Sequence, residues 1–127
     1  MNVRMNEYVD KAKFVEDFKV RTKAFAIRCI YLFRKLPKTD DARIVGRQLF
    51  RSAASVAANY RAACRARSKA EFFAKLSITL EEADESLFWI EIMIESEIFP
   101  EAKLNGLKQE ATEILSVLAK ARKRITK

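Results

Sequence analysis

The sequence predicts a single all-α domain over residues 1–127, folded as an antiparallel up-down-up-down four-helix bundle. Half of its 127 residues are hydrophobic, which is enough to bury one core. It contains only two Gly and two Pro, and folds rich in β-strands need more turn residues than that. Apolar residues also recur at alternating spacings of three and four along four segments, the pattern of helices with one buried face. Four such faces cover one another when helices pack at about 20°.

The first predicted helix spans residues 11–36, and residues 1–10 before it are expected to form a flexible N-terminal segment. Pro37 ends this helix, because the residue before a proline disfavours helical geometry. Thr39 or Asp40 can then cap the next helix. The apolar face of the first helix is expected to comprise Val15, Phe18, Thr22, Phe25, Cys29, Leu32 and Leu36.

The second predicted helix spans residues 41–66, and its inner face contains small and polar residues that allow close helix packing. We expect Ser52 and Asn59 on this helix, with Ser86 on the third, to be core polar residues that set the register of packing. A contact between Asn59 and a ligand is the alternative. The inner face of the second helix is expected to comprise Val45, Leu49, Ser52, Val56, Asn59 and Ala63.

The third and fourth predicted helices span residues 69–96 and 100–125. Ser68 and Glu71 have the spacing of a capping box, and Pro100 suits the first turn of the fourth helix. The connections are short, so neighbouring helices should be antiparallel. The inner faces are expected to comprise Phe73, Leu76, Leu80, Ala83, Leu87, Ile90 and Ile94 on the third helix, and Leu104, Leu107, Ala111, Ile114, Leu118, Ala121 and Ile125 on the fourth.

The third helix carries apolar residues beyond those needed for its inner face. Residues 87–94 are apolar nearly all round, and a helix with this pattern is buried on every side. We expect a second subunit to cover the excess; the alternative is that the N-terminal segment, with Tyr8, folds over it. The predicted oligomer interface comprises Phe88, Trp89, Ile92, Glu81 and Glu85.

Charge is segregated along a chain whose net charge is +8 and whose pI is about 9.7. Residues 42–70 contain basic residues and no acid, whereas residues 71–101 contain many acids and one base, Lys75. At about 100° per residue, four arginines of the second helix lie opposite its inner face, and Arg51 lies at the edge of that row. Arginine binds phosphate through two hydrogen bonds, so we expect a nucleic-acid backbone as partner. The predicted nucleic-acid site comprises Arg43, Arg47, Arg51, Arg61, Arg65, Arg67, Lys120, Arg122, Lys123 and Arg124.

Two alternatives remain for these cations. The arginines of the second helix can pair with the acidic helix of a neighbouring subunit. The cations near the C-terminus can instead favour the negative end of the last helix dipole.

Several function classes find no support in the sequence. There is no histidine, and Cys29 and Cys64 are far apart, which argues against a zinc site and a disulfide scaffold. We expect no metal and no cofactor. No glycine-rich phosphate loop or nucleophile elbow is present, so the protein is not expected to be an enzyme. Without an apolar leader or a run of ~20 apolar residues, we expect a cytoplasmic protein that does not associate with membranes.

One stretch resembles a known family. Arg51, Ser55, Val56 and Asn59, followed by a Ser68 to Phe72 segment that contains Glu71, resemble the bacterial 23S rRNA-intervening-sequence protein family. The resemblance implies a four-helix bundle that assembles as a ring-shaped pentamer, and it carries over no catalytic residue. Related bundles are accessory proteins of diversity-generating retroelements, which bind nucleic acid and a reverse transcriptase.

The sequence and the resemblance together favour one function over another. The leading hypothesis is a non-enzymatic homo-oligomer that binds RNA or DNA backbone through basic surfaces. The alternative is a protein-interaction adaptor whose arginines serve subunit contacts.

Overall fold

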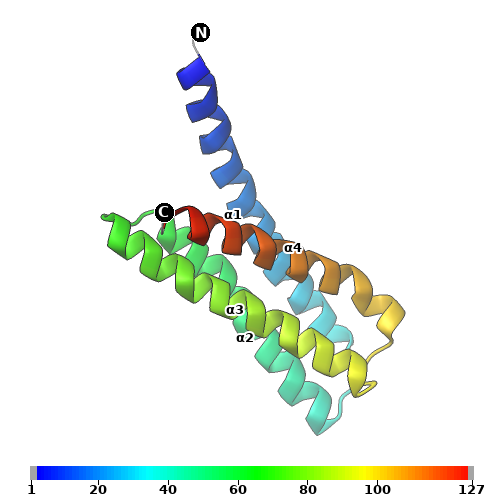
Figure 1. Cartoon of the computed structure of the whole chain (residues 1–127). Coiled ribbons are helices and arrows are strands. Elements are labelled where there is room, and N and C mark those ends of the chain that lie inside the picture. The colour runs from blue at the N-terminus through cyan, green and yellow to red at the C-terminus, as the bar shows by residue number, and fades with distance from the viewer. Residues whose placement is uncertain (1–2, 126–127) are drawn as a thin grey trace.

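The protein is a bundle of four helices, described by a computed structural model over residues 3–125, with side chains from residue 10 onward. The helices are α1 (Val3–Lys35), α2 (Asp40–Ala63), α3 (Lys69–Glu95) and α4 (Glu101–Ile125), and residues 3–125 contain no strand. Consecutive helices run antiparallel and lie side by side (Figure 1). The predicted all-α four-helix bundle is therefore confirmed.

Helix α1 is longer than predicted. It begins at Val3 rather than at residue 11, and its N-terminal turns extend beyond the other three helices (Figure 1). The backbone of residues 3–10 consequently does not fold over α3. The flexibility expected for residues 1–10 stays a prediction, and residues 1–2 lie outside the described chain.

The helix boundaries follow local hydrogen bonds. Thr39 occupies the N-cap position of α2, yet its side chain accepts no capping bond from the helix. Asp41 acts nearby: its carboxylate accepts the Ala42 N–H at 2.9 Å, and hydrogen bonds from Thr39 and Ala42 lower its pKa. At α3, the Ser68 hydroxyl accepts the Glu71 N–H at 3.0 Å, as predicted.

A left-handed residue closes α3. The Ile98 N–H donates to the Met93 carbonyl at 3.0 Å, and the Glu97 N–H donates to the Ile94 carbonyl at 3.1 Å. These two bonds form a Schellman motif, with Glu97 in the left-handed position at φ 60°. Pro100 then directly precedes α4.

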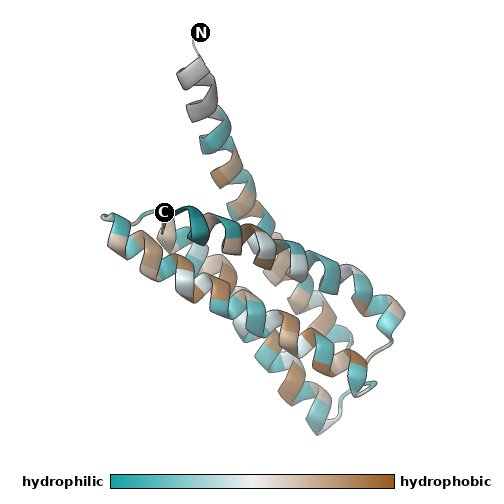
Figure 2. Cartoon of the chain, in the orientation of Figure 1, coloured by the Kyte–Doolittle hydropathy of each residue, from teal (hydrophilic) through white to brown (hydrophobic). Residues whose placement is uncertain are grey.

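Three of the four predicted inner faces are observed nearly as expected. Figure 2 shows hydrophobic and hydrophilic residues alternating along each helix. Val15 of α1 is only half-buried, as are Ala121 and Ile125 of α4. The fully packed members are Phe18, Thr22, Phe25, Cys29, Leu32 and Leu36 of α1, Val45, Leu49, Ser52, Val56 and Ala63 of α2, and Leu104, Leu107, Ala111, Ile114 and Leu118 of α4.

The register predicted for α3 was wrong by one residue at several positions. Its buried face contains Thr79, Ser86 and Met93, while Leu80, Leu87 and Ile94 are half-buried beside it. Two of the buried residues, Thr79 and Ser86, are polar. Ser86 was predicted as a core polar residue, whereas a pattern based on apolar residues passes over Thr79. Their hydroxyls are satisfied by carbonyls one turn earlier, as Thr79 Oγ1 donates to the Lys75 carbonyl at 2.8 Å.

Asn59 does not lie in the core. It is half-buried, and its amide donates to the Ser55 carbonyl and hydroxyl of the same helix, each at 2.9 Å. Tyr60 occupies the buried position instead, and its ring meets the Phe18 ring edge-on at 4.8 Å between centroids. Local bonding therefore holds the Asn59 amide on its own helix.

Ser52 and Ser86 join α2 and α3 inside the core. Both residues are fully buried, and the Ser86 hydroxyl lies 2.9 Å from the Ser52 hydroxyl. Ser52 in turn donates to the Leu49 carbonyl at 3.0 Å. The pair satisfies its own polar atoms in a small space; its role in setting the register stays a prediction.

Candidate nucleic-acid interface

Four arginines form an exposed row along α2 and the turn that follows it, which we call the arginine row: Arg43, Arg47 and Arg61 on α2, and Arg65 in the turn. All four are exposed. Within the described part of the chain, none of them forms a salt bridge or a side-chain hydrogen bond. Four guanidinium groups are therefore available to an anionic partner.

Arg51 differs from the arginine row because its charge is used within the chain. Its Nη2 lies 2.6 Å from Oε2 of Glu85, and its Nη1 lies 3.3 Å from Oε2 of Glu82. The hydrogen bond from Arg51 lowers the pKa of Glu85, whereas burial raises the pKa of Glu82. Arg51 faces the α3 side of α2, which explains why it lies at the edge of the row. Its role in binding nucleic acid stays a prediction.

Arg67 is also separate from the arginine row. Helix α2 ends at Ala63, so Arg67 lies in the following turn rather than on the helix. Its backbone N–H donates to the Glu71 carboxylate at 3.2 Å, and its Nε lies 3.6 Å from the same carboxylate. This arrangement ties the start of α3 to the preceding turn.

Helix α1 adds two lysines beside the arginine row. A groove of about 590 Å³ between α1 and α2 is lined by Lys19, Lys23, Arg61 and Arg65, and no acid lines it. Lys19 pairs with Glu16 one turn away, at 2.6 Å. The floor is aliphatic apart from one aromatic ring, and comprises Val20, Ala26, Ile30, Phe50, Ala54, Ala57 and Ala58. The sequence analysis missed the lysines, although their spacing of four on the outer face of α1 could have indicated them.

The predicted basic cluster at the C-terminus lies apart from this groove. The Arg122 guanidinium stacks over the Phe73 ring of α3, 5.3 Å from its centroid. Lys120 and Arg124 line a cavity of about 620 Å³ with Phe14 and other residues of α1. Lys123 is exposed at the end of α4. None of these four residues lines the groove between α1 and α2.

The outer face of α3 exposes less apolar surface than predicted. Phe88 is 49% exposed, but Trp89 and Ile92 are half-buried and pack against the core of the same chain. The Phe88 and Trp89 rings meet edge-on at 5.0 Å, and the indole N–H of Trp89 donates to Glu85 at 3.3 Å. Glu81 is exposed beside them. The role of this face in assembly stays a prediction, with Phe88 as its one fully projecting ring among the three residues proposed.

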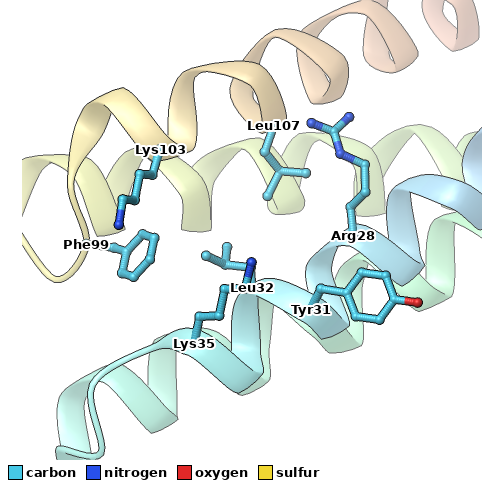
Figure 3. Close-up of a pocket in the computed structure, with 7 residues that line it drawn as sticks. All are labelled: Arg28, Tyr31, Leu32, Lys35, Phe99, Lys103 and Leu107. Carbon is cyan, nitrogen blue, oxygen red and sulfur yellow. The ribbon is translucent and has the colours of Figure 1, made fainter.

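A second cationic cavity, which we call the α1/α4 trough, was not predicted. It has a volume of about 610 Å³ and lies between the C-terminal half of α1 and the start of α4 (Figure 3). Its lining combines three cations with two aromatic rings and two leucines: Arg28, Tyr31, Leu32, Lys35, Phe99, Lys103 and Leu107. The spacings of three and four between Arg28, Tyr31 and Lys35 could have indicated a shared face, but the partner segment could not be known.

The thiols are not arranged for nucleophilic chemistry. Cys29 is buried and Cys64 is half-buried, and both are free. Burial raises the pKa of Cys29 to about 12 and also raises the pKa of Cys64. A neutral, enclosed thiol is a poor nucleophile. In the described part of the chain, no group of three or more His, Cys, Asp or Glu residues is placed to hold a metal ion.

Fold and surface together define a class: a small, basic, all-α bundle with free arginines along its second helix and the turn after it. The model of the 23S rRNA-intervening sequence protein family matches residues 16–120. The chain therefore belongs to the 23S rRNA-intervening sequence protein family, as the resemblance predicted.

A solved structure supports the same fold. The chain is similar to a crystal structure of a protein with unknown function from the S23 ribosomal protein family of Bacteroides thetaiotaomicron VPI-5482, with 31% identity and a TM-score of 0.79. The match covers 86% of this chain and 97% of that one. No curated protein sequence matches this chain. None of the helices in residues 3–125 has the length and apolar character needed to span a membrane.

Proposed function

We propose that this protein is a non-enzymatic homo-oligomer that binds the backbone of RNA or DNA through the arginine row. The observation that carries the proposal is the contrast between free and engaged arginines along α2 and the turn after it. Arg51 is held by two carboxylates of the same chain, whereas Arg43, Arg47, Arg61 and Arg65 are exposed and make no internal ion pair with the described residues.

The surroundings of the row favour a polyanion. Lys19 and Lys23 lie across the groove from Arg61 and Arg65, and the net charge of +8 attracts nucleic acid over longer distances. The groove floor is almost entirely aliphatic, so it offers little to unpaired bases. Contacts of this kind bind phosphates without reading sequence.

Self-association is the second part of the proposal. Phe88 projects from α3 with about half of its surface exposed, next to the half-buried Ile92 and the exposed Glu81. Exposed aromatic side chains of this kind favour protein interfaces. A pentameric ring, with a nucleic-acid strand and a reverse transcriptase among its partners, is what the family resemblance supports.

The salt dependence of binding tests the nucleic-acid part. Four phosphate contacts per subunit give a slope of about −3.6 in a plot of log K against log salt for duplex DNA, and roughly 100-fold weaker binding at 200 mM than at 50 mM salt. Fluorescence anisotropy with a labelled duplex and a labelled single strand measures this slope. Absence of binding to both at 50 mM salt would refute the proposal.

Single substitutions identify which cations contribute. Arg47→Gln or Arg61→Gln should each reduce the slope by about 0.9. Lys108→Gln is the matched control, because Lys108 is an exposed cation on α4 that lines none of the cavities described above. An equal reduction of the slope in the Lys108→Gln variant would show a nonspecific effect of net charge and would refute the arginine row as the binding site.

A protein-interaction adaptor is the second candidate, and charge complementarity favours it. The groove carries four cations around an aliphatic floor, while α3 exposes Phe88 with Glu81 and Asp84 nearby. The arginines would then serve contacts between subunits. In that case Arg61→Glu with Arg65→Glu dissociates the oligomer in light scattering, and no nucleic acid binds to either form.

A further inference from the structure

The α1/α4 trough has the composition of a nucleotide site rather than of a backbone-binding groove. We infer that it binds one unpaired nucleotide, with the phosphate on its cations and the base against an aromatic ring. The nucleotide can belong to a single strand or be free in solution. If the nucleotide belongs to a strand, the inference rests on the proposed nucleic-acid binding. It then specifies single-stranded nucleic acid as the form that the trough binds.

The cations of the trough are not neutralised by the chain. In residues 10–125, Arg28, Lys35 and Lys103 form no salt bridge, and no acid lines the cavity. Glu110 of α4 lies within electrostatic reach of Arg28, and its pKa is lowered first by Arg21 and last by Arg28. Arg21 holds that carboxylate with two hydrogen bonds, at 2.6 and 2.9 Å. Three positive charges therefore face the trough without a bound counter-charge.

Arg28 reaches across the trough from one helix to the other. A Cβ atom added at Gly106 of α4 would lie 3.5 Å from Nη2 of Arg28, so the guanidinium lies close above the α4 backbone. Figure 3 shows Arg28 and Tyr31 at one end of the trough, and Phe99, Lys103 and Lys35 at the other. A phosphate in the trough can therefore meet cations from both helices.

The aromatic rings offer surfaces for a base. Tyr31 is 54% exposed, and Phe99 is half-buried with its ring 5.7 Å from the Lys103 ammonium. Between the rings, the nearly buried Leu32 and Leu107 form an apolar floor. Bases stack on such rings regardless of their identity. Paired bases already stack within a duplex, so this contact selects for unpaired nucleotides.

The two cationic cavities should therefore differ in the strands that they bind. The α1/α2 groove has an almost aliphatic floor and four cations, which suits backbone phosphates of either form. The α1/α4 trough has two rings and three cations. Only a strand with an exposed base uses both features of the trough.

Substitutions at Tyr31 test the inference on the full chain. Tyr31→Leu should weaken binding of a single-stranded oligonucleotide about tenfold, as the loss of one stacked base does, and leave a duplex of equal length unchanged. Tyr31→Phe should restore single-strand binding, because it keeps the ring. Anisotropy at one salt concentration measures all three proteins. Equal affinities of the Leu and Phe variants for the single strand would overturn the inference.

The failure of this site can be told from the failure of the arginine row. Arg61→Gln with Arg65→Gln should weaken single strand and duplex alike. If the double arginine variant loses binding and Tyr31→Leu has no effect, the nucleotide site in the trough is refuted and the arginine row is not. Loss in Tyr31→Leu with no effect of the arginine variant supports the trough and refutes the row.

Binding of a free nucleotide tests the trough independently of strand binding. Equilibrium dialysis with labelled uridine monophosphate should show binding that Lys35→Gln weakens and Lys108→Gln does not. Uridine and inorganic phosphate, each alone, should bind more weakly than the nucleotide, since each uses one half of the site. If the wild-type protein binds neither an oligonucleotide nor the monophosphate, both the row and the trough are refuted.

Discussion

Helices α2 and α3 pack against each other, yet their outer faces have opposite character. The outer face of α2 and the turn after it present four free arginines, whereas the outer face of α3 presents acids and the half-exposed ring of Phe88. At the boundary, Arg51 forms ion pairs with Glu82 and Glu85. This difference is the basis for proposing two separate partners: a polyanion on α2 and a protein surface on α3.

The largest expected effect comes from reversing charge on α2. Arg61→Glu with Arg65→Glu should weaken nucleic-acid binding at least 100-fold at 50 mM salt, about 2.7 kcal/mol, because two phosphate contacts become repulsive. Anisotropy measures the change. Glu81→Gln on α3 is the control, and it should leave the affinity unchanged or raise it slightly. Equal losses in both variants would contradict the division between the two faces.

The next effect concerns the apolar part of α3. Phe88→Glu should dissociate the oligomer, since truncating or charging an interface anchor costs about 2 kcal/mol or more. Light scattering measures the mass of the variant. Ile44→Glu alters a residue of α2 that is 58% exposed, and it should leave the mass unchanged. Dissociation by Ile44→Glu but not by Phe88→Glu would show that the subunit contact lies on α2 rather than on α3.

A third prediction concerns how closely α2 packs against α1. A Cβ atom at Gly46 would lie 2.6 Å from Cδ1 of Leu36 and 2.9 Å from the Phe33 ring. Overpacking costs about 1–3 kcal/mol, so Gly46→Ala should lower the free energy of unfolding despite a gain of about 1 kcal/mol in helix propensity.

Gly106→Ala on α4 is the matched control for Gly46→Ala. Its Cβ would meet only Arg28 Nη2, at an ordinary 3.5 Å. It should raise the free energy of unfolding by about 0.5–1 kcal/mol, because Gly is unfavourable within a helix. Urea unfolding of both variants measures the difference, and stabilisation by Gly46→Ala would show that the α1–α2 contact is loose.

The smallest effect is the pH dependence of the boundary pair. The pKa of Glu85 is lowered in the folded protein, chiefly by Arg51. A carboxyl with a lowered pKa contributes stability above its unfolded pKa of about 4.3 and loses that contribution as the pH falls through the folded pKa. The Arg51→Gln variant should therefore lose less stability than the wild type when the pH is lowered below about 5.

The size of this pH effect is limited by exposure. The Arg51 side chain is 49% exposed and Glu85 is 34% exposed, so the pair should contribute less than about 1 kcal/mol. The pKa of Glu82 is raised by burial and changes stability in the opposite direction. Urea unfolding at several pH values tests the prediction, and parallel pH profiles for wild type and Arg51→Gln would contradict it.

The fold was predictable because apolar spacing reports which helix face is buried. That rule located the inner faces of α1 and α4 and the four helices themselves. It failed at several positions of α3, where Thr79 is buried because its hydroxyl donates to a carbonyl of its own helix. It also placed Asn59 in the core, although the amide is satisfied by Ser55.

The candidate sites were harder to predict than the fold. Helical geometry alone located the arginine row, because its four members fall on one face of the helix predicted over residues 41–66; in the structure Arg65 lies just past the end of α2. The ion pairs of Arg51 and the lining of the α1/α4 trough are both formed by side chains from different helices, and local sequence does not show which helices are neighbours. Phe99 and Tyr31 are 68 residues apart in the sequence, and no local pattern connects them.

The central claim is that this protein assembles with itself and binds nucleic acid on a separate face. Light scattering after size exclusion, at 50 mM salt and with and without a single-stranded oligonucleotide, tests both parts at once. The account predicts a mass that is a multiple of the 14.7 kDa chain, and a larger mass when the oligonucleotide is added. A 14.7 kDa species that elutes unchanged with the oligonucleotide would contradict it.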